Sequence, residues 1–158
     1  MNVSDVMRKS IASVAPAAPL IDAARLLLET NQRALPVLEA GRLVGIISEG
    51  DFLHRVELGI DPPARTWLQS LLGVSASKSY RDRISSLKVE QVMTRNPVCV
   101  EEEASLDEVV AIMDQRGVSQ LPVTCGGIVV GMISRAELLG AVERSLSESS
   151  AQTVADAA

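Results

Sequence analysis

The order of hydrophobic and polar positions is the same in both halves of the chain. Each half contains one stretch in which apolar residues recur three and four positions apart, Leu20, Ala23, Ala24 and Leu27 in the first and Leu106, Val109, Val110 and Met113 in the second. This spacing places apolar side chains on one face of an amphipathic helix. Ser105, followed three residues later by Glu108, is typical of the start of such a helix.

Short β-rich runs surround these two helices. IASVA at 11–15 and PVCVE at 97–101 precede the helices and predict short strands. LPVLEAGRLVGIIS at 35–48 and LPVTCGGIVVGMIS at 121–134 follow them, each with two β-rich runs around a turn that contains glycine, which predicts a hairpin. A second helix is expected after each hairpin, at 51–58 and 137–146. Each half is therefore predicted to form strand, helix, strand, strand, helix.

The two halves also match residue by residue. GIISEGDF begins at Gly45 and GMISRAEL begins at Gly131, 86 positions later, and the same spacing holds without a gap from Val3 to Leu53. A period this long indicates two copies of a small domain rather than a solenoid. A mixed sheet with helices on one side satisfies the rule that each element buries its apolar face, so we expect an α/β fold.

We divide the chain into a first repeat at 1–58, a connector at 59–88, a second repeat at 89–146 and a flexible tail at 147–158. The connector contains Trp67 on an apolar helical face that follows two prolines. It is interpreted either as a helix that lies on the core or as a dimer contact built around Trp67, since buried aromatic residues often anchor interfaces. The tail is small and polar.

Composition restricts the function. The chain of 158 residues is 47% hydrophobic but only 2% aromatic, so its core is expected to be aliphatic. A net charge of −5 and a pI of about 4.9 argue against binding to a nucleic-acid polymer, which usually requires a basic surface. No apolar run approaches the ~18–20 residues of a membrane span. The first residues lack the apolar segment of a signal peptide, so we expect a cytoplasmic protein.

The reactive residue types are sparse. Cys99 and Cys125 do not have CxxC spacing, and we expect them to be buried or half-buried thiols rather than a disulfide or metal site. The sequence has one histidine and lacks a nucleophile elbow, a Walker-type loop and a metal-ligand cluster. We therefore do not expect an enzyme, nor a required cofactor.

The glycine, serine and acid that occur in both repeats remain as candidate ligand-binding residues. Ser48 precedes Asp51 by three residues, and Ser134 precedes Glu137 in the same way. Such pairs commonly cap a helix start, where serine and acid satisfy free backbone N–H groups. A helix start after a glycine can also attract phosphate, and a carboxylate there can accept hydrogen bonds from a ribose diol. The spacing alone supports both interpretations.

The whole repeat resembles a cystathionine-β-synthase (CBS) domain, and the chain resembles a tandem CBS pair, or Bateman module, of the stand-alone bacterial type. The resemblance is carried by Val-Met near each start (Val6-Met7, Val92-Met93), by MTRNPVCV, by the Leu-Pro-Val runs and by Gly-x-x-Ser-x-x-acid. It implies two repeats related by a pseudo-two-fold axis. It also implies a regulatory module that binds AMP, ADP, ATP or S-adenosylmethionine in clefts between the repeats, and a homodimer.

The resemblance also implies site residues. The first cleft would use Asp51 for the ribose and Ser48 and Arg33 for phosphate, opposite a wall and base contacts formed by Thr94, Val98, Cys99, Val118 and Ser119. The second would use Ser134, Arg135 and Glu137 against Arg8, Ala12 and Ser13.

The second cleft departs from the family pattern at two positions. Glu137 replaces the usual aspartate, and Arg8 stands where the first cleft has Thr94. We therefore expect weaker binding in the second cleft. The alternative function is a structural dimerisation module whose clefts are vestigial, and the degenerate second motif favours it.

Overall fold

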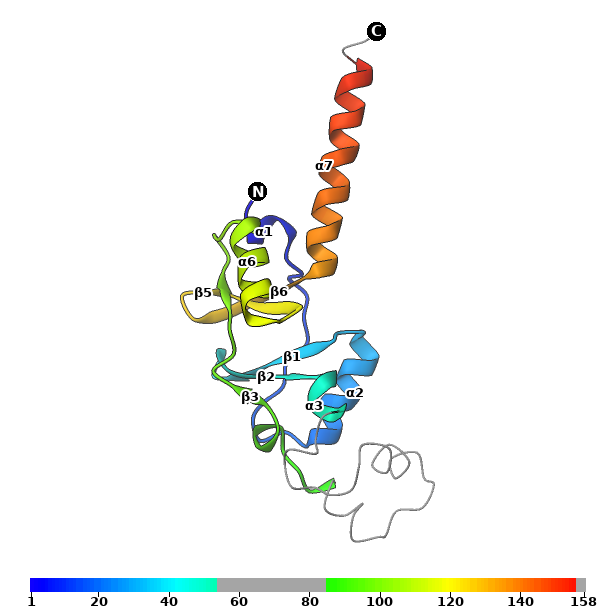
Figure 1. Cartoon of the computed structure of the whole chain (residues 1–158). Coiled ribbons are helices and arrows are strands. Elements are labelled where there is room, and N and C mark those ends of the chain that lie inside the picture. The colour runs from blue at the N-terminus through cyan, green and yellow to red at the C-terminus, as the bar shows by residue number, and fades with distance from the viewer. Residues whose placement is uncertain (54–84, 156–158) are drawn as a thin grey trace. The chain divides into compact units, whose positions relative to one another are not determined.

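The structure, a computed structural model, describes residues 1–53 and 85–155, and the chain separates into two compact units. We name them by their acidic residues. The Asp51 unit comprises Ala12–Pro97, and the Glu137 unit comprises Met1–Ile11 together with Val98–Ala158. Each unit therefore contains most of one repeat and the leading segment of the other (Figure 1).

The Asp51 unit is built on a β-hairpin with a third strand at its edge. Its elements are α2 (Leu20–Thr30), β1 (Ala34–Glu39), β2 (Arg42–Ser48), α3 (Glu49–Leu53), the 3-10 helix η2 (Val89–Gln91) and β3 (Thr94–Arg95). Strand β1 pairs antiparallel with β2, and Ala34 lies opposite Ser48. Strand β3 pairs antiparallel with the other edge of β2, where Thr94 lies opposite Ile46.

The Glu137 unit repeats this plan. Its elements are α1 (Val3–Val6), β4 (Val100–Glu101), α6 (Leu106–Arg116), β5 (Gln120–Cys125), β6 (Ile128–Ser134) and α7 (Arg135–Ala155). Strand β5 pairs antiparallel with β6, with Gln120 opposite Ser134, and parallel with β4. Arg8 forms a β-bridge with Met132 of β6, at the position that corresponds to Thr94 beside β2.

Backbone hydrogen bonds hold the exchanged leading segments in place. In the Glu137 unit, the N–H of Val3 donates to the carbonyl of Ala104 over 3.0 Å. In the Asp51 unit, the N–H of Val89 donates to the carbonyl of Ala18 over 2.9 Å. These bonds satisfy backbone groups that burial would otherwise leave unpaired. The leading segments are therefore integral parts of their units.

Each unit has its own aliphatic core. In the Asp51 unit the buried cluster is Val14, Leu20, Ala23, Leu27, Leu35, Val37, Ile47, Val89, Val92 and Met93. In the Glu137 unit it is Val3, Val100, Val109, Met113, Leu121, Val123 and Ile133. The predicted face of α2, both hairpins and the aliphatic character of the core are confirmed. On α6, Val109 and Met113 are buried as predicted, but Val110 is 44% exposed and does not belong to the core face. The side chain of Ser105 accepts the predicted capping bond from the N–H of Glu108 at 3.2 Å.

The leading strands are shorter than predicted. Within 11–15, Val14 forms an isolated bridge to Val37, and within 97–101 only β4 is regular strand. The first difference is explained by Gln32, whose side chain bonds both backbone groups of Ala12 and so takes the place of a strand partner there. Its carbonyl oxygen accepts from the Ala12 N–H at 2.7 Å, and its amide donates to the Ala12 carbonyl at 3.3 Å.

Helix α7 is longer than predicted. We expected its end at residue 146 and a flexible tail from residue 147, but the helix continues to Ala155. Residues 141–155 contain neither proline nor glycine, so no strong helix breaker ends it. In Figure 1, α7 starts beside β6 and then extends away from the rest of its unit. Within the described part of the chain, no helix combines the length and apolarity needed to cross a membrane.

Three predictions fall on residues 54–84, which lie outside the described part of the chain. These are the end of the helix predicted at 51–58, most of the connector at 59–88, and the role of Trp67. The family resemblance and the α/β fold class do not depend on them.

Candidate functional site

The end of strand β2 positions the first acid. Ser48 is the last residue of β2, and Asp51 lies in the first turn of α3. The Oδ2 atom of Asp51 accepts hydrogen bonds from the Ser48 N–H at 2.7 Å and from the Ser48 hydroxyl at 3.2 Å. The predicted capping contact is therefore confirmed. It holds a carboxylate at the turn where strand becomes helix.

Arg33 lies directly across from this turn. Because Ala34 pairs with Ser48, the residue before β1 faces the residue after β2, and the Glu49 N–H donates to the Arg33 carbonyl at 3.1 Å. The guanidinium Nε of Arg33 lies 3.3 Å from Oε1 of Glu49. Sequence reasoning missed Glu49. The signal was present, because the matching position in the second repeat is the basic residue Arg135.

Thr94 approaches β2 from the other edge. It lies opposite Ile46 in the β2–β3 pair and is exposed. Side chains two residues apart in a strand share a face, and residues opposite one another in adjacent strands do so as well. Thr94 therefore shares a face of the sheet with Ile46 and Ser48. The Asp51 unit thus brings Ser48, Asp51, Arg33 and Thr94 to one end of one strand.

The other four residues predicted for the first cleft belong to the Glu137 unit. Val98 and Val118 are half-buried there and pack against its core, whereas Cys99 and Ser119 are exposed. The N–H of Val118 donates to the carbonyl of Met113 at 3.0 Å, directly after the left-handed Gly117 that ends α6. In this unit, Val118 therefore contributes to the helix end and the core.

The Glu137 unit has the same constellation with different side chains. Oε2 of Glu137 accepts from the Ser134 N–H at 2.9 Å and from the Ser134 hydroxyl. Oε1 of Glu137 lies 3.4 Å from Nη2 of Arg8 and accepts its hydrogen bond. The Glu137 side chain is only 16% exposed. Its two carboxylate oxygens are therefore both engaged by groups of the chain.

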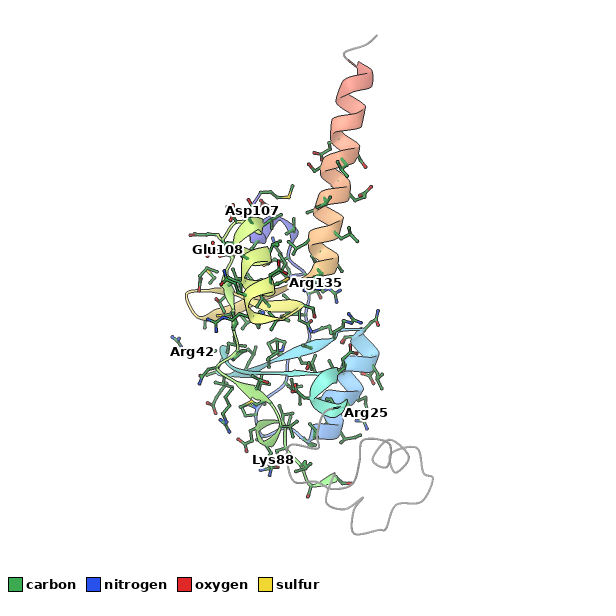
Figure 2. All side chains as sticks on the ribbon, viewed as in Figure 1. Arg25, Arg42, Lys88, Asp107, Glu108 and Arg135 are labelled. Atoms are coloured by element: carbon green, nitrogen blue, oxygen red, sulfur yellow. The ribbon has the colours of Figure 1, made fainter. Side chains whose placement is uncertain are left out.

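Arg135 is the first residue of α7, at the base of that helix (Figure 2). Its N–H donates to the carbonyl of Ser119 at 3.2 Å, and its guanidinium lies 4.0 Å from the carboxylate of Asp114. Ala12 and Ser13, predicted for the second cleft, belong to the Asp51 unit.

The cysteines differ from the prediction. We expected buried or half-buried thiols, but Cys99 and Cys125 are both exposed and free. Cys125 is exposed because it ends β5 next to the Gly126–Gly127 turn, where the strand leaves the core. Cys99 lies just before β4 and stays exposed, while the next residue, Val100, is buried in the core of the unit.

The environment of Cys125 is acidic. A hydrogen bond to Glu102, and then the negative charges of Glu102, Glu101 and Glu103, raise the pKa of the Cys125 thiol above its ordinary value. A raised pKa keeps the thiol protonated and poorly nucleophilic. In the described ranges, 1–53 and 85–155, no three His, Cys, Asp or Glu residues cluster so as to hold a metal ion.

Comparison with known proteins places these features in a family. The CBS domain family matches residues 3–58 and 89–144. Among curated proteins, the uncharacterized protein MJ1225 of Methanocaldococcus jannaschii is 27% identical over 138 residues, which are 87% of this chain and 45% of that protein. The chain thus spans about half the length of this relative.

Two solved structures share the fold. CBSX2, crystallised in complex with AMP, has a TM-score of 0.67 at 24% identity, with 90% of this chain and 96% of that chain covered; the protein of that name in Arabidopsis thaliana is a CBS-pair protein. The CBS domain pair of MJ0100, in complex with 5′-methylthioadenosine and S-adenosyl-L-methionine, has a TM-score of 0.67 at 22% identity. There, 92% of this chain and 98% of that chain are covered.

The family match covers both repeats, and each repeat contributes a strand end with a serine and an acid three residues later. The chain belongs to the CBS domain family and contains two CBS repeats.

Proposed function

We propose that the chain is a regulatory module that binds an adenosine-containing ligand, with Asp51 as the residue that recognises the ribose. The observation that carries the proposal is the arrangement at the end of β2, where Ser48, Asp51 and Thr94 come together within one unit. The adenosine ligands of the CBSX2 and MJ0100 structures support this ligand class. No chemical step is assigned to the module.

Each residue has a distinct role in this proposal. A carboxylate can accept two hydrogen bonds from the 2′- and 3′-hydroxyl groups of a ribose. The Ser48 hydroxyl and the Arg33 guanidinium would contact a phosphate, and the Thr94 hydroxyl would line the same face of the sheet. Because Asp51 also holds the Ser48 N–H, its carboxylate is already oriented before a ligand arrives, which lowers the ordering cost of binding.

The charges beside Arg33 indicate which ligands bind best. A phosphate that approaches Arg33 also approaches Glu49, whose carboxylate lies 3.3 Å from the guanidinium. Both side chains are well exposed, so the pair itself is weak, but the Glu49 charge still repels an anion. We therefore expect AMP or S-adenosylmethionine to bind more tightly than ATP.

Isothermal titration of wild type and Asp51→Asn with AMP, S-adenosylmethionine and ATP tests the proposal. An asparagine oxygen can still accept from the Ser48 N–H, so the cap survives while the charge is lost. We expect AMP affinity to fall by about 1–3 kcal/mol, the scale of a lost hydrogen bond to a charged group. Asp22→Asn, which changes an exposed carboxylate on α2, is the matched control and should bind as wild type does.

The outcome separates ligand recognition from capping. If Asp51→Asn lowers the melting temperature but leaves AMP affinity per folded molecule unchanged, Asp51 only caps the helix. If none of the three ligands produces heat or a thermal shift with wild type, the chain is not an adenosine-ligand module.

A structural dimerisation module is the second candidate. Helix α7 exposes Leu139, Val142 and Leu146, with exposed fractions of 69%, 54% and 65%. These positions are three and four residues apart and form one stripe along the helix. An apolar stripe of this kind suits a helix–helix contact with a second copy of the chain.

A further inference from the structure

The residue that lies beside the acid on the leading segment differs between the two units. Thr94 and Arg8 are 86 residues apart, as are Ile46 and Met132. Thr94 lies opposite Ile46, and Arg8 forms the corresponding bridge with Met132. The backbone arrangement is thus conserved between the units, while a short hydroxyl side chain is replaced by a long cation.

This cation is directed at the second acid. Nη2 of Arg8 donates to Oε1 of Glu137 at 3.4 Å, while Ser134 engages Oε2. The Glu137 side chain is 16% exposed and that of Arg8 is 45% exposed, whereas the acids Asp22, Glu49 and Asp114 of three other ion pairs are between 47% and 73% exposed. Partial burial reduces solvent screening, so this pair is held more firmly than those on the open surface.

We propose that Arg8 is an internal occupant of the second ligand position and keeps the module at one adenosine ligand per chain. A ribose diol that approached Glu137 would have to displace the guanidinium from Oε1. It would thereby exchange a hydrogen bond between two opposite charges for hydrogen bonds from neutral hydroxyl groups, and the attraction between guanidinium and carboxylate would be lost. Arg8 is then a specificity-determining residue. This inference rests on the proposed function, because it assumes that the matching acid Asp51 binds the ribose.

The substitution Arg8→Thr removes the guanidinium without disturbing the backbone that holds residue 8 in its unit. Arg8 is held in its unit by backbone bonds, in which its N–H donates to Met132 at 2.9 Å and its carbonyl accepts from Met132 at 3.0 Å. Threonine can make both bonds, and Thr94 occupies the corresponding place beside β2. The Arg8→Thr variant is therefore expected to fold, which circular dichroism and a thermal melt will verify.

The experiment counts AMP molecules bound per chain by equilibrium dialysis. At an AMP concentration just sufficient to saturate wild type, we expect one equivalent for wild type, two for Arg8→Thr, well below one for Asp51→Asn and about one for the double variant. Arg25→Thr is the matched control, because it makes the same substitution and removes an ion pair of 3.3 Å on α2 (Figure 2). It should remain at one equivalent.

The outcomes separate the inference from the proposed function. One equivalent for both wild type and Arg8→Thr, or two for wild type, overturns the inference and leaves the proposed function standing. No binding by wild type with one equivalent for Arg8→Thr overturns the role of Asp51 and the count of one ligand per chain, and supports only the blocking of the second position by Arg8. No binding by any variant overturns both.

Discussion

The thiol of Cys125 shows at the scale of one residue how position decides chemistry. The residue ends β5, and β4 runs parallel to that strand with Glu101 opposite Thr124. Glu102 follows directly and bonds the thiol, which raises the thiol pKa above its ordinary value. Because the thiolate is the reactive form of cysteine, an exposed thiol in this place is protected by charge rather than by burial.

Glu102→Gln should therefore make Cys125 more reactive. The substitution removes the largest cause of the raised pKa, so the thiolate fraction at neutral pH increases and the pH–rate profile for iodoacetamide alkylation shifts to lower pH. The measurement is made in a Cys99→Ser background, so that only Cys125 reacts. Glu103→Gln, which removes the smallest of these causes, should shift the profile less. Equal shifts for both variants would contradict the assignment.

At the scale of elements, a glycine marks the place where each leading segment contacts a hairpin. A Cβ built at Gly131 would lie 2.7 Å from the Arg8 carbonyl oxygen, and one at Gly45 would lie 3.0 Å from the Thr94 carbonyl oxygen. Both glycines sit on the second strand of their hairpin, β2 or β6. The absence of a side chain thus lets the backbone of the leading segment approach the strand closely.

Gly45→Ala tests this approach. The added methyl group would press on Thr94 and on the Met93 side chain, so we expect the free energy of unfolding to fall by about 1–3 kcal/mol, as overpacking usually costs. Urea denaturation measures the change. Gly140→Ala in α7 is the control, and its effect on the free energy of unfolding should have the opposite sign. Its Cβ would make only ordinary contact with Arg144. It should stabilise the helix by about 0.5–1 kcal/mol. A neutral Gly45→Ala would show that the contact relaxes.

At the scale of the whole molecule, α7 provides a surface that its own unit does not cover. Every residue from Val142 to Glu148 is exposed, so this part of the helix is not packed into the core of the unit. Leu139, Val142 and Leu146 remain in solvent on this part of the chain. Apolar stripes of this kind usually mark a contact with another molecule.

We expect the chain to be a dimer that Leu139→Glu and Leu146→Glu together convert to a monomer. Two carboxylates in the stripe would have to be desolvated for the helices to associate, which opposes association. Light scattering after size-exclusion chromatography measures the mass. Glu143→Lys and Glu148→Lys, exposed changes on the same helix, form the control pair and should leave the mass unchanged. A monomeric wild type, or a dimer that survives both glutamates, would rule out this surface.

Much of the fold and part of the site were predictable because their causes are local. The helix faces of α2 and α6 repeat every three to four residues, and each hairpin carries its own turn glycine. The bond between Ser48 and Asp51 spans only three residues. By contrast, Gln32 acts on Ala12 from 20 residues away and shortens the leading strand, and no local pattern announces that contact.

The amino-acid sequence by itself determined the two repeats, their elements and the pair of serine-to-acid turns, since periodicity and capping act over a few neighbouring residues. The family resemblance implied that each leading segment lies near the other repeat's acid, but only the tertiary structure gave the backbone pairing by which that segment joins the hairpin. Through that pairing it also decided that Arg8 engages Glu137, a residue 129 positions away. The physical reason is that a long side chain selects its partner by where two distant strands come together in space, and the backbone bonds between Arg8 and Met132 establish that meeting point.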